Sequence, residues 1–198
     1  MKLNIPKGDF AGYIFDLDGT LVDSMPLHYR AWNAALRKYG MTGQLDKDLF
    51  YSLGGVNSQS VASVFGKRYG LKLDPDEVMH VKEAMYIELI PGLKRIEPVA
   101  SFAEKVARTH PVAIATGGYC DIALPALKVT GLDSIFKIVV TPAEVPPGRG
   151  KPHPDMFLLA AKLAGVDPAK CLAFEDATPG LQAAVAAGMQ IVHVPSRA

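Results

Sequence analysis

Short apolar runs recur along this chain, and each of them ends in a polar or glycine-rich turn. Continuous apolar runs of this length are typical of parallel strands that are buried on both faces of a sheet. The pattern therefore predicts short strands at residues 13–15, 112–115, 138–140, 171–174 and 191–194.

Segments with helical periodicity separate the later strands. Val99, Phe102 and Val106 share one face before the second strand, and prolines begin expected helices at 154–163 and 179–187. This alternation predicts an α/β fold with a doubly wound, mostly parallel, Rossmann-like sheet. Ligands of such sheets bind beyond the carboxyl ends of the strands.

The spacing between the first two strands is too long for one crossover. Roughly a hundred residues separate Asp18 from Thr116, whereas a βαβ unit takes about 30. The excess has helical patterning and carries a helix start at 74–77, an aspartate cap followed by a proline. We therefore predict an inserted all-helical domain of residues 24–93, a natural lid, in a core domain of residues 1–23 and 94–198.

Composition and charge narrow the classes of function. The 198 residues have a formal net charge of +1, which argues against nucleic acid and anionic membranes as partners, because both normally demand a basic excess. The start is too polar for a secretory signal, and no apolar run approaches the roughly 18 residues of a membrane helix. Cys120 and Cys171 form no CxxC pair, and we expect both to be small core residues in a reduced cytoplasm. We predict a cytoplasmic monomer or weak dimer.

Acidic side chains follow the first and the fourth strands. Asp16 and Asp18 come after the first, and Glu175 and Asp176 close the fourth, so up to four carboxylates meet at one sheet edge. Uncompensated, these groups would repel one another and some would stay protonated. Mg²⁺ resolves such a conflict, because it commonly takes one or two carboxylates plus phosphate oxygens. The alternative is a turn at Asp18 and a helix cap at Asp176.

Two further segments offer groups that suit an anion. Thr116 and Gly117 end the second strand, where a hydroxyl and backbone N–H groups favour phosphate, although an ordinary strand-to-helix turn has the same pattern. Lys151 stands between Gly150 and Pro152 just before a helix, which limits its backbone freedom. It could neutralise a phosphate and an attacking carboxylate, although most loop lysines are simply solvated.

These segments, in this order, resemble the four motifs of haloacid dehalogenase-like phosphohydrolases: residues 16–20, Thr116, 150–152 and 175–176. The resemblance covers essentially the whole chain, with the helical insert in the position of that family's cap domain. Within the family the chain is similar to sugar-phosphate phosphatases and β-phosphoglucomutase, a likeness carried by residues 27–32 and 174–180.

The resemblance implies a role for each matched residue. Asp16 would be the nucleophile, and Asp18 would protonate the leaving oxygen and later activate water. Thr116 and Gly117 would bind phosphate oxygens, and Lys151 would be the charge clamp. Positioning and charge neutralisation dominate phosphoryl transfer, so this set suits the task.

The resemblance also implies the metal ligands. Mg²⁺ would take Asp16, the backbone carbonyl of Asp18, and Asp176, with Glu175 as a further ligand or a neighbour of the ligands. Family dehalogenases lack the second aspartate of the first motif, so Asp18 favours phosphoryl chemistry over carbon–halogen cleavage.

Specificity is expected to come from the insert. His28 and Lys82 resemble cap positions that contact substrate in β-phosphoglucomutase, and Trp32 lies one helical turn from His28. The alternative is that His28 and Lys82 are polar residues on solvated helix faces.

The sequence departs from the mutase pattern in two places. Residues 53–58 lack the arginine with which the mutase binds the second phosphate. Residues 116–119 stand where the mutase has a turn that carries a serine and a lysine. We therefore predict a Mg²⁺-dependent phosphatase acting on a small phosphosugar, with a phosphosugar mutase as the alternative and a non-catalytic binding protein as a third reading. The sequence contains neither a G-x-G-x-x-G nor a Walker A pattern, so it does not indicate a nucleotide cofactor.

Overall fold

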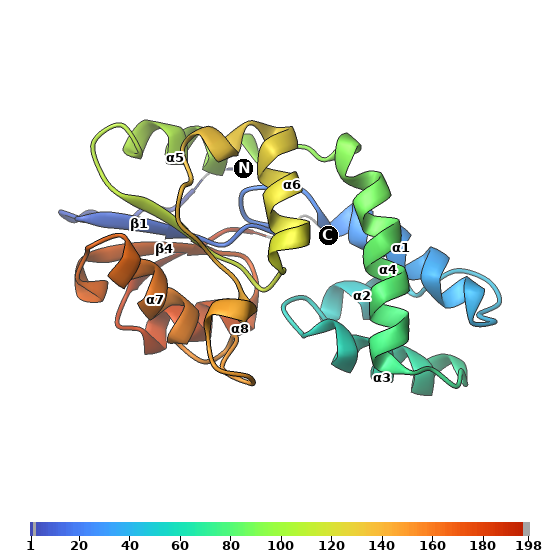
Figure 1. Cartoon of the computed structure of the whole chain (residues 1–198). Coiled ribbons are helices and arrows are strands. Elements are labelled where there is room, and N and C mark those ends of the chain that lie inside the picture. Colours follow the sequence, from blue (N-terminus) through green and yellow to red (C-terminus); the bar gives the residue numbers. More distant parts are fainter. Residues whose placement is uncertain (2, 196–198) are drawn as a thin grey trace. The chain divides into compact units, whose positions relative to one another are not determined.

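The computed structural model describes residue 1 and residues 3–195, and the chain in it divides into two compact units. One unit comprises Met1–Asp23 and Lys94–Ala198, and the other comprises Ser24–Leu93. The first holds the sheet and the second is built of helices (Figure 1). Among the described helices, none has the length and apolar character needed to cross a membrane.

The sheet of the first unit has five strands in the order β3-β2-β1-β4-β5, and each described pairing is parallel. The predicted α/β fold is therefore confirmed, and each strand end lies within one residue of the predicted apolar run. The strands are β1 (Gly12–Phe15), β2 (Val112–Ala115), β3 (Val139–Val140), β4 (Cys171–Glu175) and β5 (Gln190–His193).

Helices cover both faces of the sheet, as expected for a doubly wound fold. Figure 1 shows α5 (Glu97–Val106) and α6 (Cys120–Thr130) on one face, and α7 (Asp155–Leu163) and α8 (Thr178–Ala186) on the other. The remaining helices of this unit are short 3-10 turns, η2 (Leu132–Ser134), η3 (Pro142–Glu144) and η4 (Pro168–Lys170).

The two faces of the sheet are packed differently. Toward α7 and α8 the core is rich in alanine, with Met156 and Phe157 filling the larger spaces. On the opposite face, Phe15 stacks on Phe174 with ring centroids 4.7 Å apart, and Phe102 of α5 lies 5.1 Å from Phe174. Burying a phenylalanine contributes about 1.5–3 kcal/mol, so both layers fix the strands whose ends carry the polar residues.

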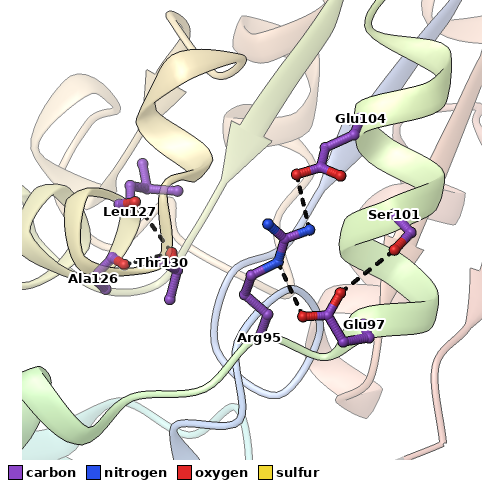
Figure 2. Close-up of polar contacts among 7 residues, drawn as sticks. All are labelled: Arg95, Glu97, Ser101, Glu104, Ala126, Leu127 and Thr130. Atoms are coloured by element: carbon purple, nitrogen blue, oxygen red, sulfur yellow. Dashed lines mark hydrogen bonds and ion pairs between the residues drawn. The ribbon is translucent and has the colours of Figure 1, made fainter.

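Polar contacts stabilise the start of α5 and the last turn of α6 (Figure 2). Arg95 reaches Glu104 at 2.8 Å and Glu97 at 3.4 Å, so its guanidinium ties the segment before α5 to the helix. Within α6, the hydroxyl of Thr130 donates to the carbonyl oxygens of Ala126 and Leu127. A buried hydroxyl in the last turn of that helix thus finds its acceptors inside the helix.

Two details of this unit differ from the sequence predictions. The prolines at 154 and 179 do not occupy the first helical positions, because α7 begins at Asp155 and α8 at Thr178. Cys171 is buried as predicted, but the prediction for Cys120 is wrong. Cys120 is the first residue of α6, and it is exposed.

The second unit consists of α1 (Met25–Lys38), α2 (Lys47–Ser52), α3 (Ser58–Tyr69), α4 (Pro75–Leu89) and the 3-10 turn η1 (Ile90–Gly92). The predicted helix start is confirmed, because the Asp74 carboxylate accepts from the N–H groups of Asp76 and Glu77, each at 3.0 Å. The core gathers aromatic and aliphatic side chains, among them Trp32, Phe50 and Phe65.

The buried residues of α4 include a charged side chain as well as apolar ones. Val78, Lys82 and Tyr86 are the buried residues of this helix, whereas Val81 and Met85 are only half-buried. Because α4 packs against both α1 and α3, its covered surface is wider than one apolar stripe. Lys82 is therefore buried along with Val78 and Tyr86.

Candidate active site

The carboxyl ends of β1 and β4 bring distant residues together. Asp16 directly follows β1, and its N–H donates to the carbonyl oxygen of Phe174 on β4 at 2.9 Å. The ammonium of Lys151 donates to Asp16 Oδ1 at 2.6 Å and lies 3.5 Å from Glu175 Oε2. The lysine is thus enclosed against two carboxylates and is not a solvated loop residue.

Three acidic residues form a cluster with the spacing of a metal site. Asp16, Glu175 and Asp176 each offer one carboxylate oxygen, and these oxygens lie within 4.8 Å of one another. Asp16 and Glu175 are 5% and 2% exposed, so water screens them little. Hard carboxylate oxygens at this spacing fit a divalent cation such as Mg²⁺.

The pKa shifts of the clustered residues also favour a bound cation. Burial raises the pKa of Asp16 and that of Glu175, and the nearby carboxylates raise both further, while Lys151 opposes the shift. The pKa of Asp176 rises to about 7, first through burial and then through Asp16. Burial lowers the pKa of Lys151, but Asp16 and Glu175 raise it more, so the ammonium stays charged. One lysine cannot balance three carboxylates, which leaves room for a cation.

Two glycines let the acidic side chains adopt these positions. Gly19 has φ +82°, and a Cβ there would overlap with the Asp176 carboxylate. A Cβ at Gly180 in α8 would overlap with the carboxylate of Glu175. Thr20 adds a hydrogen bond from its hydroxyl to Asp176 Oδ1 at 3.2 Å. Thr20 and Gly180 were not predicted as site residues, although both lie in segments that carry the family resemblance.

Asp18 and Thr116 lie near the same strand ends. The N–H of Gly118 donates to Thr116 Oγ1 at 3.1 Å, and a Cβ on Gly118 would lie 3.5 Å from Asp18 Oδ2. The Asp18 carboxylate therefore borders the turn after β2. Thr116 is fully buried, whereas Gly117 is exposed with open space around its α carbon. Such a turn leaves space for a phosphate group beside its backbone.

The three candidate substrate contacts of the insert lie together within the helical unit. Lys82 is 5% exposed, and its Nζ lies 5.8 Å from the Trp32 ring and 5.6 Å from the Tyr86 ring. The alternative of a solvated Lys82 is therefore wrong. His28 stacks on Tyr86 with ring centroids 3.9 Å apart. Sequence reasoning missed Tyr86, and the substrate role of the three residues stays a prediction.

A parallel sheet that gathers acidic residues and a buried lysine at its ligand-binding edge has the organisation of an α/β enzyme. Comparison with known proteins agrees, since the family model described as haloacid dehalogenase-like hydrolase matches residues 10–188. The chain therefore belongs to this family of hydrolases.

Individual relatives cover nearly the whole chain. Fructose-1-phosphate phosphatase YqaB of Escherichia coli is 36% identical over 189 residues, which span 93% of this chain and 96% of that protein. The β-phosphoglucomutase of Bacillus subtilis is 30% identical and spans 91% of this chain and 81% of that protein. Among solved structures, β-phosphoglucomutase from Clostridium difficile matches with a TM-score of 0.78 at 25% identity, covering 92% of this chain and 83% of that one.

Proposed function

We propose that this protein hydrolyses a sugar phosphate with the help of Mg²⁺, through a phosphoryl group carried transiently on Asp16. The observation that carries the proposal is the buried Asp16 carboxylate, held 2.6 Å from Lys151 and grouped with two further acids at the sheet edge. A nucleophile, a cation and a metal-binding set in one place are what phosphoryl transfer requires.

In the proposed reaction, a carboxylate oxygen of Asp16 attacks phosphorus and the ester P–O bond breaks. Asp18 gives its proton to the leaving sugar oxygen and then accepts one from a water molecule. That water attacks the phosphoryl group, the bond to Asp16 breaks, and phosphate leaves. Lys151 and the turn at Thr116 and Gly117 hold the phosphate oxygens.

The acidic cluster fits a cation that takes part in this chemistry. When bound, Mg²⁺ supplies positive charge that offsets the repulsion between the carboxylates and the phosphate. Asp16, Asp176 and Glu175 would hold it, together with the backbone carbonyl of Asp18. Lys151 remains beside Asp16 and neutralises the negative charge that the metal leaves uncompensated.

A sugar phosphate is the substrate class that the relatives' names support, since these include fructose-1-phosphate phosphatase, hexitol phosphatase and β-phosphoglucomutase. Because β-phosphoglucomutase is among these relatives, a mutase reaction is the second candidate function. Hydrolysis is favoured because residues 53–58 carry no cationic side chain for a second phosphate. A mutase must hold a bisphosphate at both ends while it excludes water.

The direct test measures phosphate release from a panel of hexose, pentose and hexitol phosphates, together with nucleotides and phosphoglycolate. We expect release from at least one sugar phosphate with Mg²⁺ and none after chelation. Rapid exchange between sugar 1- and 6-phosphates, primed by a bisphosphate and with negligible phosphate release, would establish the mutase instead. Activity that survives chelation would refute the metal requirement.

Stability should depend on pH in a way that the cation reverses. In the metal-free protein, Asp176 has its pKa raised from 3.8 to about 7, so the folded state holds a proton that the unfolded state has lost. The free energy of unfolding should therefore fall, by about 2–4 kcal/mol, as pH rises from about 4 to about 7. Mg²⁺ at about 100 times its Kd should restore about 2.7 kcal/mol above this window.

Denaturant unfolding across this pH range, with and without Mg²⁺, measures both effects. Asp176→Asn is the matched control, because it removes the titrating group and one metal ligand. This variant should reduce the pH dependence to the part that Asp16 and Glu175 contribute, and it should weaken the response to Mg²⁺. Equal pH profiles for the variant and the wild type would contradict the assignment.

A further inference from the structure

Lys151 owes its position to a short loop that precedes α7. The lysine side chain is long and flexible, so its ammonium is fixed only as well as the backbone that carries it. Nevertheless, Nζ is held 2.6 Å from Asp16 and 3.5 Å from Glu175, and it lies 5.3 Å from the ring centroid of Phe157. Contacts this specific require a well-fixed loop.

The two ends of this loop are joined by a double hydrogen bond. Arg149 donates from Nε to Asp155 Oδ1 at 3.0 Å and from Nη2 to Asp155 Oδ2 at 2.8 Å. A guanidinium that meets a carboxylate with two parallel bonds fixes direction as well as distance. Lys151 lies between the two partners in sequence, so the pair closes a loop around it.

Two further contacts tighten the same loop. Arg149 Nη1 lies 3.2 Å from His153 Nδ1, and the His153 N–H donates to the Gly150 carbonyl oxygen at 3.0 Å. Asp155 is the first residue of α7, whose Met156 and Phe157 are fully buried in the core. Arg149 is thereby tied to a helix that cannot shift without disturbing the sheet.

The exposure of the pair indicates what it does. The side chains of Arg149 and Asp155 are 45% and 22% exposed, and ion pairs this exposed contribute little to global stability. The hydrogen bonds from Arg149 lower the pKa of Asp155, so that carboxylate stays ionised at neutral pH. A persistent pair with little global effect can still restrict one loop.

We propose that Arg149 and Asp155 are positioning residues that hold the loop so that Lys151 reaches Asp16 and Glu175. This inference rests on the proposed function, because it gives the loop a part in the same phosphoryl transfer. Neither side chain has to touch the substrate. They act through Lys151, and this dependence can be measured.

The test is a double-mutant cycle with Lys151. Arg149→Ala should lower kcat/KM by about tenfold, because small displacements of a catalytic group are costly. Arg149→Lys keeps the charge but loses the parallel bonds, so it should lose most of the same activity. In a Lys151→Ala background, adding Arg149→Ala should change kcat/KM by less than about twofold. Lys162→Ala, which removes an exposed positive charge from α7, is the control and should stay within about twofold of the wild type.

A second readout does not depend on activity. Hydrogen exchange of the amides in residues 149–155, the His153 amide above all, should be faster in Arg149→Ala and unchanged in Lys162→Ala. Faster exchange without phosphatase activity in any variant would refute the proposed function but not the positioning of the loop. Unchanged exchange would overturn the positioning role, and so would equal losses from Arg149→Ala in both backgrounds or full activity in Arg149→Lys.

Discussion

Replacement of Asp16 by asparagine should abolish turnover while the fold remains intact. Asparagine has nearly the same shape but no anionic oxygen, so the bond to phosphorus cannot form, and a loss of about 10⁴-fold or more in kcat is expected. The fold should survive because Lys151 keeps Glu175 as a partner, 3.5 Å away. Removing one of three crowded carboxylates also relieves repulsion.

Rapid quench and mass spectrometry can show the covalent step directly. The wild type, stopped in acid during turnover, should carry one phosphoryl group on the peptide that contains Asp16, and Asp16→Asn should carry none. Asp9→Asn is a suitable control, because Asp9 is an exposed aspartate of the same unit. Near-normal turnover by Asp16→Asn, or a phosphoryl group on another residue, would disprove the nucleophile assignment.

Much of the fold could be predicted because its strands are buried on both faces. Such strands leave unbroken apolar runs in the sequence, and the carboxyl ends of parallel strands meet at one edge. This is why Asp16 and Glu175, which are far apart in the sequence, could be expected to converge. Lys151 could be placed only by its match to a family motif, since its loop has no periodic pattern.

Other features could not be predicted, because they depend on how side chains pack in three dimensions. A lysine on an amphipathic helix normally indicates a solvated face, yet Lys82 is enclosed by aromatic rings because two helices cover α4. The Arg149–Asp155 pair requires a particular loop path. The sequence of a helical segment does not show which side chain lies against one of its glycines. The contact between Gly180 and Glu175 therefore could not be predicted.

That contact at Gly180 leads to a substitution whose effect on stability should change sign. In the wild type, Gly180→Ala places a methyl group into the Glu175 carboxylate, which is 2% exposed and cannot move into solvent. Overpacking of this kind costs about 1–3 kcal/mol of unfolding free energy. Activity should fall as well, by about tenfold or more, because a displaced Glu175 disturbs both Lys151 and the metal ligands.

The same substitution should be harmless or favourable once Glu175 is shortened. In a Glu175→Ala background the obstructing atoms are gone, and alanine is then the better residue for the helix by about 0.5–1 kcal/mol. Unfolding free energies of the wild type, the two single variants and the double variant measure the coupling between the two sites. A Gly180→Ala effect of the same sign and size in both backgrounds would show that Glu175 does not lie against Gly180. A reversal would show that the absence of a side chain at residue 180 is what allows a buried glutamate to stand beside the nucleophile and its lysine.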